Sequence, residues 1–130
     1  MKNLLIHGLV AGLLAGIAGI IYLSIYTAAF GVDYSQMINI GSIMGSSLIG
    51  CMLMTLGYAA LAKFNKQNLE GWLNILIAIL SFASIMGPIG MSLPLDVEFP
   101  ELFPGLVVPM HFFPALAFFS IYPFFKQNKI

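Results

Sequence analysis

The sequence predicts an all-α integral membrane protein. We expect a four-transmembrane-helix bundle that forms a single domain over residues 1–130, with both termini in the cytoplasm. The first observation is composition, since 60% of the residues are hydrophobic and only 8% are charged, whereas soluble domains carry about a quarter charged residues. The second is a set of long apolar segments, and the third is the way charges alternate between the loops that join them.

The apolar segments cover residues 4–30, 37–62, 72–91 and 106–125, approximately. A bilayer core of about 30 Å needs about 20 helical residues, so each segment is long enough to cross it. The segments are too long and too evenly apolar for barrel strands, and a helix satisfies its own backbone hydrogen bonds in lipid. The first segment is also too long for the apolar part of a signal peptide and lacks a small-residue cleavage site, so we interpret it as a retained helix.

Lysine placement predicts the orientation. Under this topology the five lysines fall on one side of the membrane: Lys2, Lys63, Lys66, Lys126 and Lys129. The loops of the other side contain no lysine and carry Asp33, Asp96, Glu98 and Glu101. Lysine-rich loops face the cytoplasm, which gives the N-in, C-in arrangement. The run HGLVAGLLAGIAG (residues 7–19) resembles the small-residue first helices of small bacterial inner-membrane proteins, which implies that location.

Glycine spacing predicts a close helix contact along the first segment. Gly8, Gly12 and Gly16 form two overlapping GxxxG units, and Gly41 and Gly45 form another in the second segment. Small residues let helix backbones approach closely in lipid, where packing drives association. Two uses of this helix-packing seam remain open, namely packing within the chain and association between copies in a homo-oligomer.

Other patterns predict how the helices are arranged. The second segment has small or polar residues on several sides, so we expect it at the centre of the bundle without a lipid-facing side. Pro109, Pro114 and Pro123 each remove a backbone donor, so the fourth helix should bend. His7 begins the first helix and is interpreted as an interfacial residue at the headgroups. Cys51 lies in an apolar run and is interpreted as a small buried hydrophobe.

Polar residues of all four helices are expected at one level, toward the outer side. Polar groups inside a membrane span are costly unless partnered, and ionisable ones suggest function. We interpret them as an outward-facing cavity under the Pro-rich outer loop, residues 87–105, with room for a proton, a cation or a small polar ligand. The alternative is that the hydroxyls bond to their own helices and that His111 bonds to a carbonyl freed by Pro109 or Pro114. The candidate residues are His111, Asp96, Glu98, Glu101, Tyr26, Asn39, Ser42, Ser46, Ser81 and Ser84.

Several classes of function lack a sequence signature. Net charge is zero and arginine is absent, so no basic patch for nucleic acid is expected. No nucleophile motif, phosphate loop or cofactor motif is present. His111 with Asp96, Glu98 and Glu101 would suit a metal ion, but their spacing matches no metal signature, so we expect neither a metal nor a cofactor.

The expectation is therefore a non-catalytic helix-bundle subunit, or a ligand- or partner-binding protein, embedded in a lipid bilayer. The outer loop would be either a lid or a docking surface. A small homo-oligomer that transports protons, cations or solutes is the alternative, and a membrane enzyme is the third possibility. The partners would be further copies of the chain or a larger membrane complex.

Overall fold

The computed structural model describes residues 2–125, in which helices and turns occur but no strand. Four helical runs are long and apolar enough to cross a membrane: Lys2–Phe30, Ile40–Lys63, Gln67–Gly90 and Pro100–Phe125. The prediction of an all-helical chain with four such segments is confirmed. The elements are α1 (Lys2–Phe30), α2 (Ile40–Lys63), η1 (Gln67–Leu69), α3 (Glu70–Ser84), α4 (Met86–Gly90), η2 (Pro100–Leu102), α5 (Phe103–Met110) and α6 (Phe113–Phe125).

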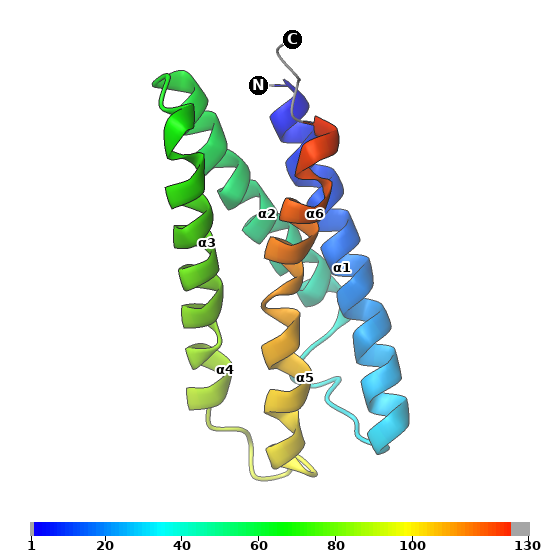
Figure 1. The fold of residues 1–130 in the computed structure, drawn as a ribbon. Coiled ribbons are helices and arrows are strands. Elements are labelled where there is room, and N and C mark those ends of the chain that lie inside the picture. Colours follow the sequence, from blue (N-terminus) through cyan, green and yellow to red (C-terminus); the bar gives the residue numbers. More distant parts are fainter. Residues whose placement is uncertain (1, 126–130) are drawn as a thin grey trace.

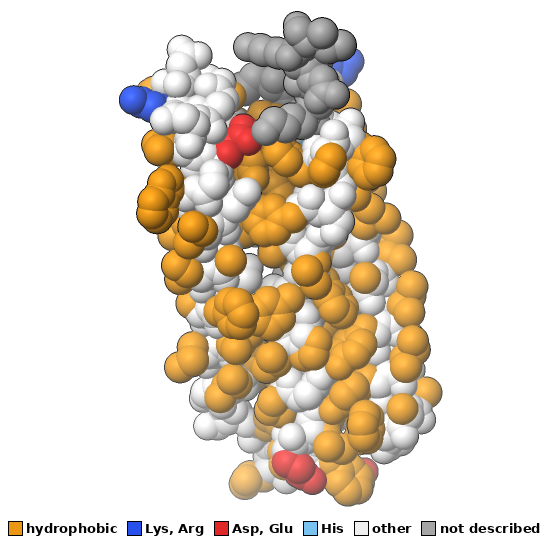
Figure 2. Space-filling model, viewed as in Figure 1, with side chains coloured by type: hydrophobic (Ala, Val, Ile, Leu, Met, Phe, Trp, Pro, Cys, Tyr) orange, Lys and Arg blue, Asp and Glu red, His pale blue; other side chains and the backbone are white. Residues whose placement is uncertain are grey.

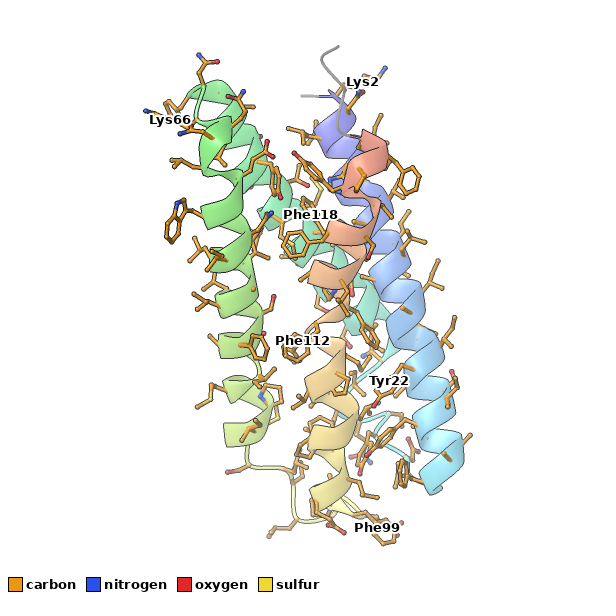
Figure 3. The ribbon with its side chains drawn as sticks, viewed as in Figure 1. Lys2, Tyr22, Lys66, Phe99, Phe112 and Phe118 are labelled. Atoms are coloured by element: carbon orange, nitrogen blue, oxygen red, sulfur yellow. The ribbon has the colours of Figure 1, made fainter. Side chains whose placement is uncertain are left out.

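The helices run alongside one another, and Figure 1 shows α3 set apart from α5 and α6 while α2 crosses behind them. α1 packs along α2 and α6. We call the end with Lys2, residues 64–69 and Phe125 the terminal end, and the end with residues 31–39 and 91–99 the loop end. On the face in Figure 2, hydrophobic side chains cover the middle and lysines lie only at the terminal end. Lys2 and Lys66 lie at this same end, on opposite sides of the bundle (Figure 3), whereas Lys126 and Lys129 lie outside the described residues.

The glycines of α1 lie against α2. A Cβ atom added at Gly12 would be 2.8 Å from Leu48 Cδ2 and 2.9 Å from Leu48 Cα, and one at Gly8 would collide with the Thr55 hydroxyl. The two backbones therefore approach this closely only because these positions have no side chain. Gly16 lies in the same way against Met44.

The other glycine pair has a different environment. A Cβ atom at Gly45 would have nothing within 4 Å, and one at Gly41 would meet only the Asn39 side chain, at 3.2 Å. The two parts of the predicted helix-packing seam therefore differ, since only the α1 glycines have a neighbouring helix against them.

The prediction that α2 lies at the centre without a lipid-facing side is wrong. Ile49, Leu53 and Leu56 are 64%, 63% and 59% exposed, although other sides of α2 contact α1, α3 and α6. Small residues on several sides of a helix indicate several close neighbours, but they do not require that every side be covered.

Local capping explains where α2 begins. Asn39 Oδ1 accepts a hydrogen bond from Ser42 N at 2.9 Å, and Ser42 Oγ accepts one from Asn39 N at 3.0 Å. The apolar run suggested a helix start at Met37, but this capping box starts the helix at Ile40.

The predicted outer loop is shorter than expected. Residues 86–90 are helical as α4, and helical structure resumes at Pro100, so the irregular segment is 91–99. Pro100 stands at the start of η2 and Pro104 at the start of α5, where a missing N–H costs nothing. Pro100 and Pro104, which we took as loop residues, therefore lie at helix starts, whereas Pro94 is in the irregular segment.

The fourth span is broken at His111 and Phe112, which separate α5 from α6. Pro109 has no N–H to offer the carbonyl of Gly105, and Pro114 has none for that of Met110. The hydroxyl of Tyr22 donates to Gly105 O at 2.9 Å and so replaces the missing helical donor. The bend expected from the prolines is thus a local interruption of the helix.

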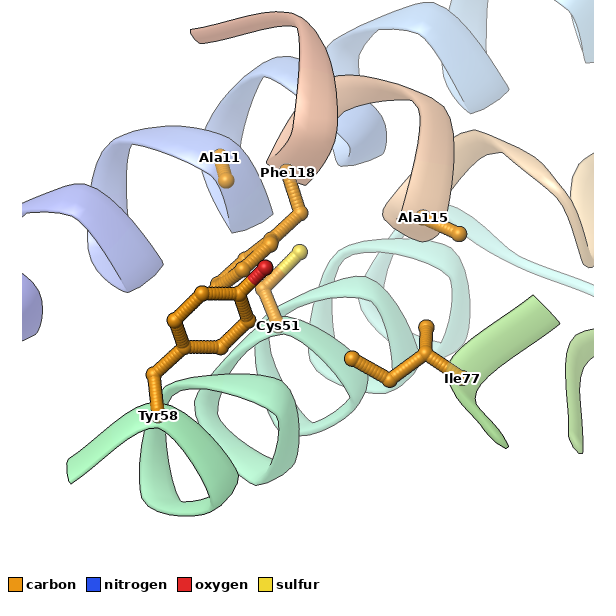
Figure 4. Packing of buried hydrophobic residues seen from close by; sticks show 6 residues of the cluster. All are labelled: Ala11, Cys51, Tyr58, Ile77, Ala115 and Phe118. Carbon is orange, nitrogen blue, oxygen red and sulfur yellow. The ribbon is translucent and has the colours of Figure 1, made fainter. Parts of the chain in front are cut away.

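Two buried clusters hold the helices together. The cluster nearer the terminal end joins α1, α2, α3 and α6, and Figure 4 shows Phe118 beside Cys51 and Tyr58 within it. The cluster at the loop end joins the 31–39 loop to α5. The first consists of Ala11, Cys51, Tyr58, Ile77, Ala115 and Phe118, and the second of Val32, Tyr34, Phe103, Leu106 and Val107.

Candidate functional site

A cavity of about 720 Å³ lies between α2, α3 and the α5–α6 segment. Its volume is within the usual range for small-ligand sites, about 300–1,000 Å³. Most of its wall is apolar, but polar side chains from three of the four spans also line it. These are Ser42, Ser46, Ser47, Ser81, Ser84 and His111.

Helical spacing brings these side chains to the cavity. On α2, Ser42, Ser46 and Gly50 are four residues apart and share one face, and on α3 Ser81 and Ser84 are three apart. His111 comes from the break between α5 and α6. Irregular backbone at membrane depth is tolerated where it lines a cavity or is buried in protein.

Four of the cavity serines donate their hydroxyl protons to their own helices. The acceptors are Asn39 O for Ser42 at 2.8 Å, Ile43 O for Ser46 at 3.1 Å, Ile77 O for Ser81 at 2.9 Å and Ser81 O for Ser84 at 2.7 Å. This is the arrangement that the alternative interpretation describes. Because their protons are used, these hydroxyls offer the cavity mainly oxygen lone pairs.

His111 is held in one tautomer. Its Nδ1 lies 2.7 Å from Val107 O, and because a carbonyl only accepts, Nδ1 carries the proton. Nε2 of the neutral ring is then a hydrogen-bond acceptor. The acceptor is neither Gly105 O nor Met110 O, the two carbonyls that the prolines deprive directly. It is the carbonyl of Val107, which the interrupted helix leaves without its usual N–H donor because His111 N donates to Val108 O at 3.2 Å.

Ser47 is a cavity residue that the sequence analysis did not select. Its side chain is only 6% exposed and lines the cavity, yet it makes no hydrogen bond to any residue between 2 and 125. The hydroxyl oxygen is not among the buried atoms without a partner, so it is open to the cavity. The position of Ser47 on the helical wheel, away from Ser42 and Ser46, gave no signal that it would face the same space.

Ser47 and His111 lie at the same level of the bundle. Ile43 and Met110 both lie beside Gly19, and Gly50 lies beside Pro114. On α2, Ser47 lies between Ile43 and Gly50. On the α5–α6 segment, His111 lies between Met110 and Pro114. The unpartnered hydroxyl and the imidazole therefore belong to one cross-section of the cavity.

The structure brings five of the ten predicted residues together at the cavity, namely Ser42, Ser46, Ser81, Ser84 and His111. The other five have different places. The Tyr26 hydroxyl donates to Leu102 O at 2.7 Å, and Asn39 caps α2. Asp96, Glu98 and Glu101 are exposed at the loop end and do not line the cavity. Within residues 2–125, no group of three His, Cys, Asp or Glu side chains is suitably placed for a metal ion.

Residues 91–99 fold onto the 31–39 loop rather than over the cavity wall. The Tyr34 hydroxyl donates to Phe99 O at 2.7 Å, and Tyr34 itself is 1% exposed. Leu93 and Val97 pack against the cluster at the loop end. Burial raises the pKa of Tyr34 above its ordinary value of 10.0, with a smaller contribution from Tyr26 and Glu101.

His7 corrects a second expectation, since it does not lie at a headgroup surface. It is fully buried, its Nε2 donates to Phe118 O at 2.9 Å, and its Nδ1 has no partner among the described residues. Its ring centroid lies 4.1 Å from that of Phe118, 5.5 Å from that of Tyr122 and 5.2 Å from that of Phe125. A signal was present, because His7 is one helical turn before Ala11 on the small-residue face that packs inward.

The cavity therefore offers lone pairs from four serines and His111, one free hydroxyl on Ser47, and a long apolar wall. No family model matches this chain, and no curated protein or solved structure matches it either.

Proposed function

We propose that this chain is a non-catalytic integral membrane protein that binds a small molecule in the cavity between α2, α3 and the α5–α6 segment. The observation that carries the proposal is the Ser47 hydroxyl, which has no partner among residues 2–125 and opens into the cavity in the same cross-section as His111. A bound polar group would supply the hydrogen bond that Ser47 lacks and would donate one to Nε2 of His111.

The side chains around the cavity support binding rather than catalysis. Cys51 is fully buried, and its Sγ points its weak donor at Pro114 O, 3.5 Å away. The carboxylates of Asp96, Glu98 and Glu101 do not line the cavity. No carboxylate or thiol from residues 2–125 lines the cavity beside His111. The serines on the wall are the only nucleophiles near it, and a serine nucleophile needs a base that a third group orients, whereas His111 Nδ1 is bonded to the backbone at Val107 O.

The proposed setting is a bacterial inner membrane with both termini in the cytoplasm. Its support is charge, since Lys2, Lys63 and Lys66 belong to the terminal end while Asp33, Asp96, Glu98 and Glu101 belong to the loop end. In this orientation the serine-rich part of the cavity lies toward the outer side.

The test is a comparison of matched serine variants purified from native membranes. We expect a small molecule to co-purify with the wild-type protein and to be lost from Ser47→Ala, as detected by mass spectrometry of the extract. Ser120→Ala is the control, because the exposed Ser120 hydroxyl donates to Leu116 O at 2.6 Å, away from the cavity. The same molecule at the same stoichiometry in Ser47→Ala and in His111→Leu would refute the proposal.

A second candidate function is solute transport by a homo-oligomer, since four short helices alone enclose little pathway. The observation that favours it is the Gly41 and Gly45 pair, since a Cβ atom added at either position would meet no other helix of residues 2–125 within 4 Å. Gly45→Leu should then split an oligomer that is observed for the wild-type protein in native-lipid particles. A wild-type monomer in those particles would eliminate this candidate.

A further inference from the structure

The wall of the cavity changes character along its length. Toward the loop end it carries Ser42, Ser46 and Ser84, and toward the terminal end it carries the larger apolar residues Leu53, Met54, Leu73, Leu76 and Ile77. Leu73 and Ser84 are eleven positions apart on α3, or about 16 Å at 1.5 Å per residue. Ser42 and Met54 are twelve apart on α2, or about 18 Å. The cavity is therefore elongated along the helices. One half carries the serines and His111 together with Ile38, Ile43, Val107 and Met110, and we call it the polar half; the other half is lined by apolar residues alone.

We infer that the occupant is a neutral single-chain amphiphile with a hydroxylated headgroup, such as a monoacylglycerol. Its hydroxyls would lie from the level of Ser47 and His111 toward Ser42 and Ser84, and its acyl chain would lie against the leucines. This inference rests on the proposed function and specifies the ligand class for the same cavity.

The donors and acceptors of the polar half favour hydroxyls. The hydroxyl protons of four serines are already donated to backbone carbonyls, and the Nδ1–H tautomer of His111 leaves Nε2 as an acceptor. A matching headgroup must therefore donate several hydrogen bonds, and it must also accept one from the free Ser47 hydroxyl. A hydroxyl group does both.

The absence of charge on the wall favours a neutral headgroup. No lysine, aspartate or glutamate from residues 2–125 lines the cavity. An ionised headgroup would lose its water without gaining a counter-charge, which is costly in an apolar environment. A carboxylate would in addition face the lone pairs of the serines.

An amphiphile has a lateral route into this cavity. Leu53, Leu76 and Leu80 line it and are nevertheless 63%, 50% and 57% exposed. The wall between α2 and α3 therefore reaches the outer surface of the bundle. The only residue of α3 that is buried is Ile77, at 7% exposure, so α3 can move without disrupting a large packed surface.

The first experiment measures thermal stability with three probes of equal chain length. Wild-type protein in phosphatidylcholine nanodiscs is melted with a thiol-reactive dye, which reports unfolding because Cys51 is the only cysteine and is fully buried. We expect saturating 1-lauroylglycerol to raise the melting temperature by about 5 °C, with much smaller shifts from dodecane and from laurate. The shift should be lost in Ser47→Ala and kept in Ser120→Ala.

The second experiment tests the orientation of the ligand. A monoacylglycerol with a photoreactive diazirine at the end of its chain should label peptides that contain Leu73, Leu76 or Leu53. Labelling near Ser42 and Ser84 instead would overturn the proposed orientation.

The outcomes separate this inference from the proposed function. Equal shifts from dodecane and 1-lauroylglycerol would overturn headgroup recognition, and a larger shift from laurate would overturn neutrality. If no amphiphile shifts the melting temperature but Ser47→Ala loses another co-purified molecule, the amphiphile inference fails while the binding function stands. If Ser47→Ala loses nothing in either experiment, both fail.

Discussion

Gly12→Ala should destabilise the protein by forcing α1 and α2 apart. The added Cβ atom would lie 2.8 Å from Leu48 Cδ2 and 2.9 Å from Leu48 Cα. A leucine side chain can rotate away, but a Cα atom cannot, so the helices themselves must separate. Overpacking of this kind costs about 1–3 kcal/mol, and the gain from replacing a helical glycine by alanine offsets about 0.5–1 kcal/mol. We expect a net loss of about 1–2 kcal/mol in the free energy of unfolding.

Gly45→Ala is the matched control. It is the same substitution inside a helix, but its Cβ atom would have nothing within 4 Å, so we expect it to gain about 0.5–1 kcal/mol. Unfolding would be measured in mixed micelles of increasing dodecyl sulfate content, through the reactivity of the buried Cys51 thiol. A Gly12→Ala protein as stable as Gly45→Ala would refute the close contact between α1 and α2. A change confined to oligomeric state would place the Gly12 contact between copies of the chain.

Three further predictions use the same unfolding assay or a simple probe of the loop. Tyr22→Phe removes the hydroxyl that donates to Gly105 O and should lower the free energy of unfolding by about 1 kcal/mol. The loss should be much smaller in a Pro109→Ala background, where residue 109 supplies a helical N–H to the same carbonyl. A double-mutant cycle that shows no coupling between the two positions would contradict this. His7→Ala should lower the free energy of unfolding by about 3 kcal/mol more than His7→Phe does. Alanine leaves a void among three aromatic rings, whereas phenylalanine fills the space and also removes an unpartnered nitrogen. Equal losses for the two variants would refute the buried placement of His7. Burial raises the pKa of Tyr34 in the folded state above 10.0, so its contribution to stability is complete below pH 10.0 and is lost as the pH rises above that value. Proteolysis within residues 91–99 should therefore accelerate as the pH rises above about 10 in the wild-type protein but not in Tyr34→Phe.

Part of the candidate site could be predicted from the spacing of its residues. Ser42 and Ser46 share a helix face, as do Ser81 and Ser84, and the position of each within its apolar run predicts its depth. His111 stood out as an ionisable group inside a span. These are properties of residues close together in the chain, so no knowledge of neighbouring helices was needed to select them.

The errors arose where the neighbour of a residue decides its role. His7 looked interfacial because it is near the start of the chain, but aromatic rings of α6 enclose it. Ser47 looked unimportant on the helical wheel, but α3 and the α5–α6 break leave space beside it. Asn39 and the prolines at 100 and 104 are a different case, because their roles are local: Asn39 caps α2, and the prolines lie in the first turns of helices.

The sequence by itself determined four apolar helical spans and a set of polar side chains at one level, because helical period and hydropathy are local along the chain. Only the tertiary structure decided that the Gly8, Gly12 and Gly16 face lies against α2, and that α2, α3 and the broken fourth span surround a cavity. The physical reason is that a close approach of two helices, or a space between three, depends on how backbones cross and which side chains interdigitate. Those relations join residues far apart in the sequence.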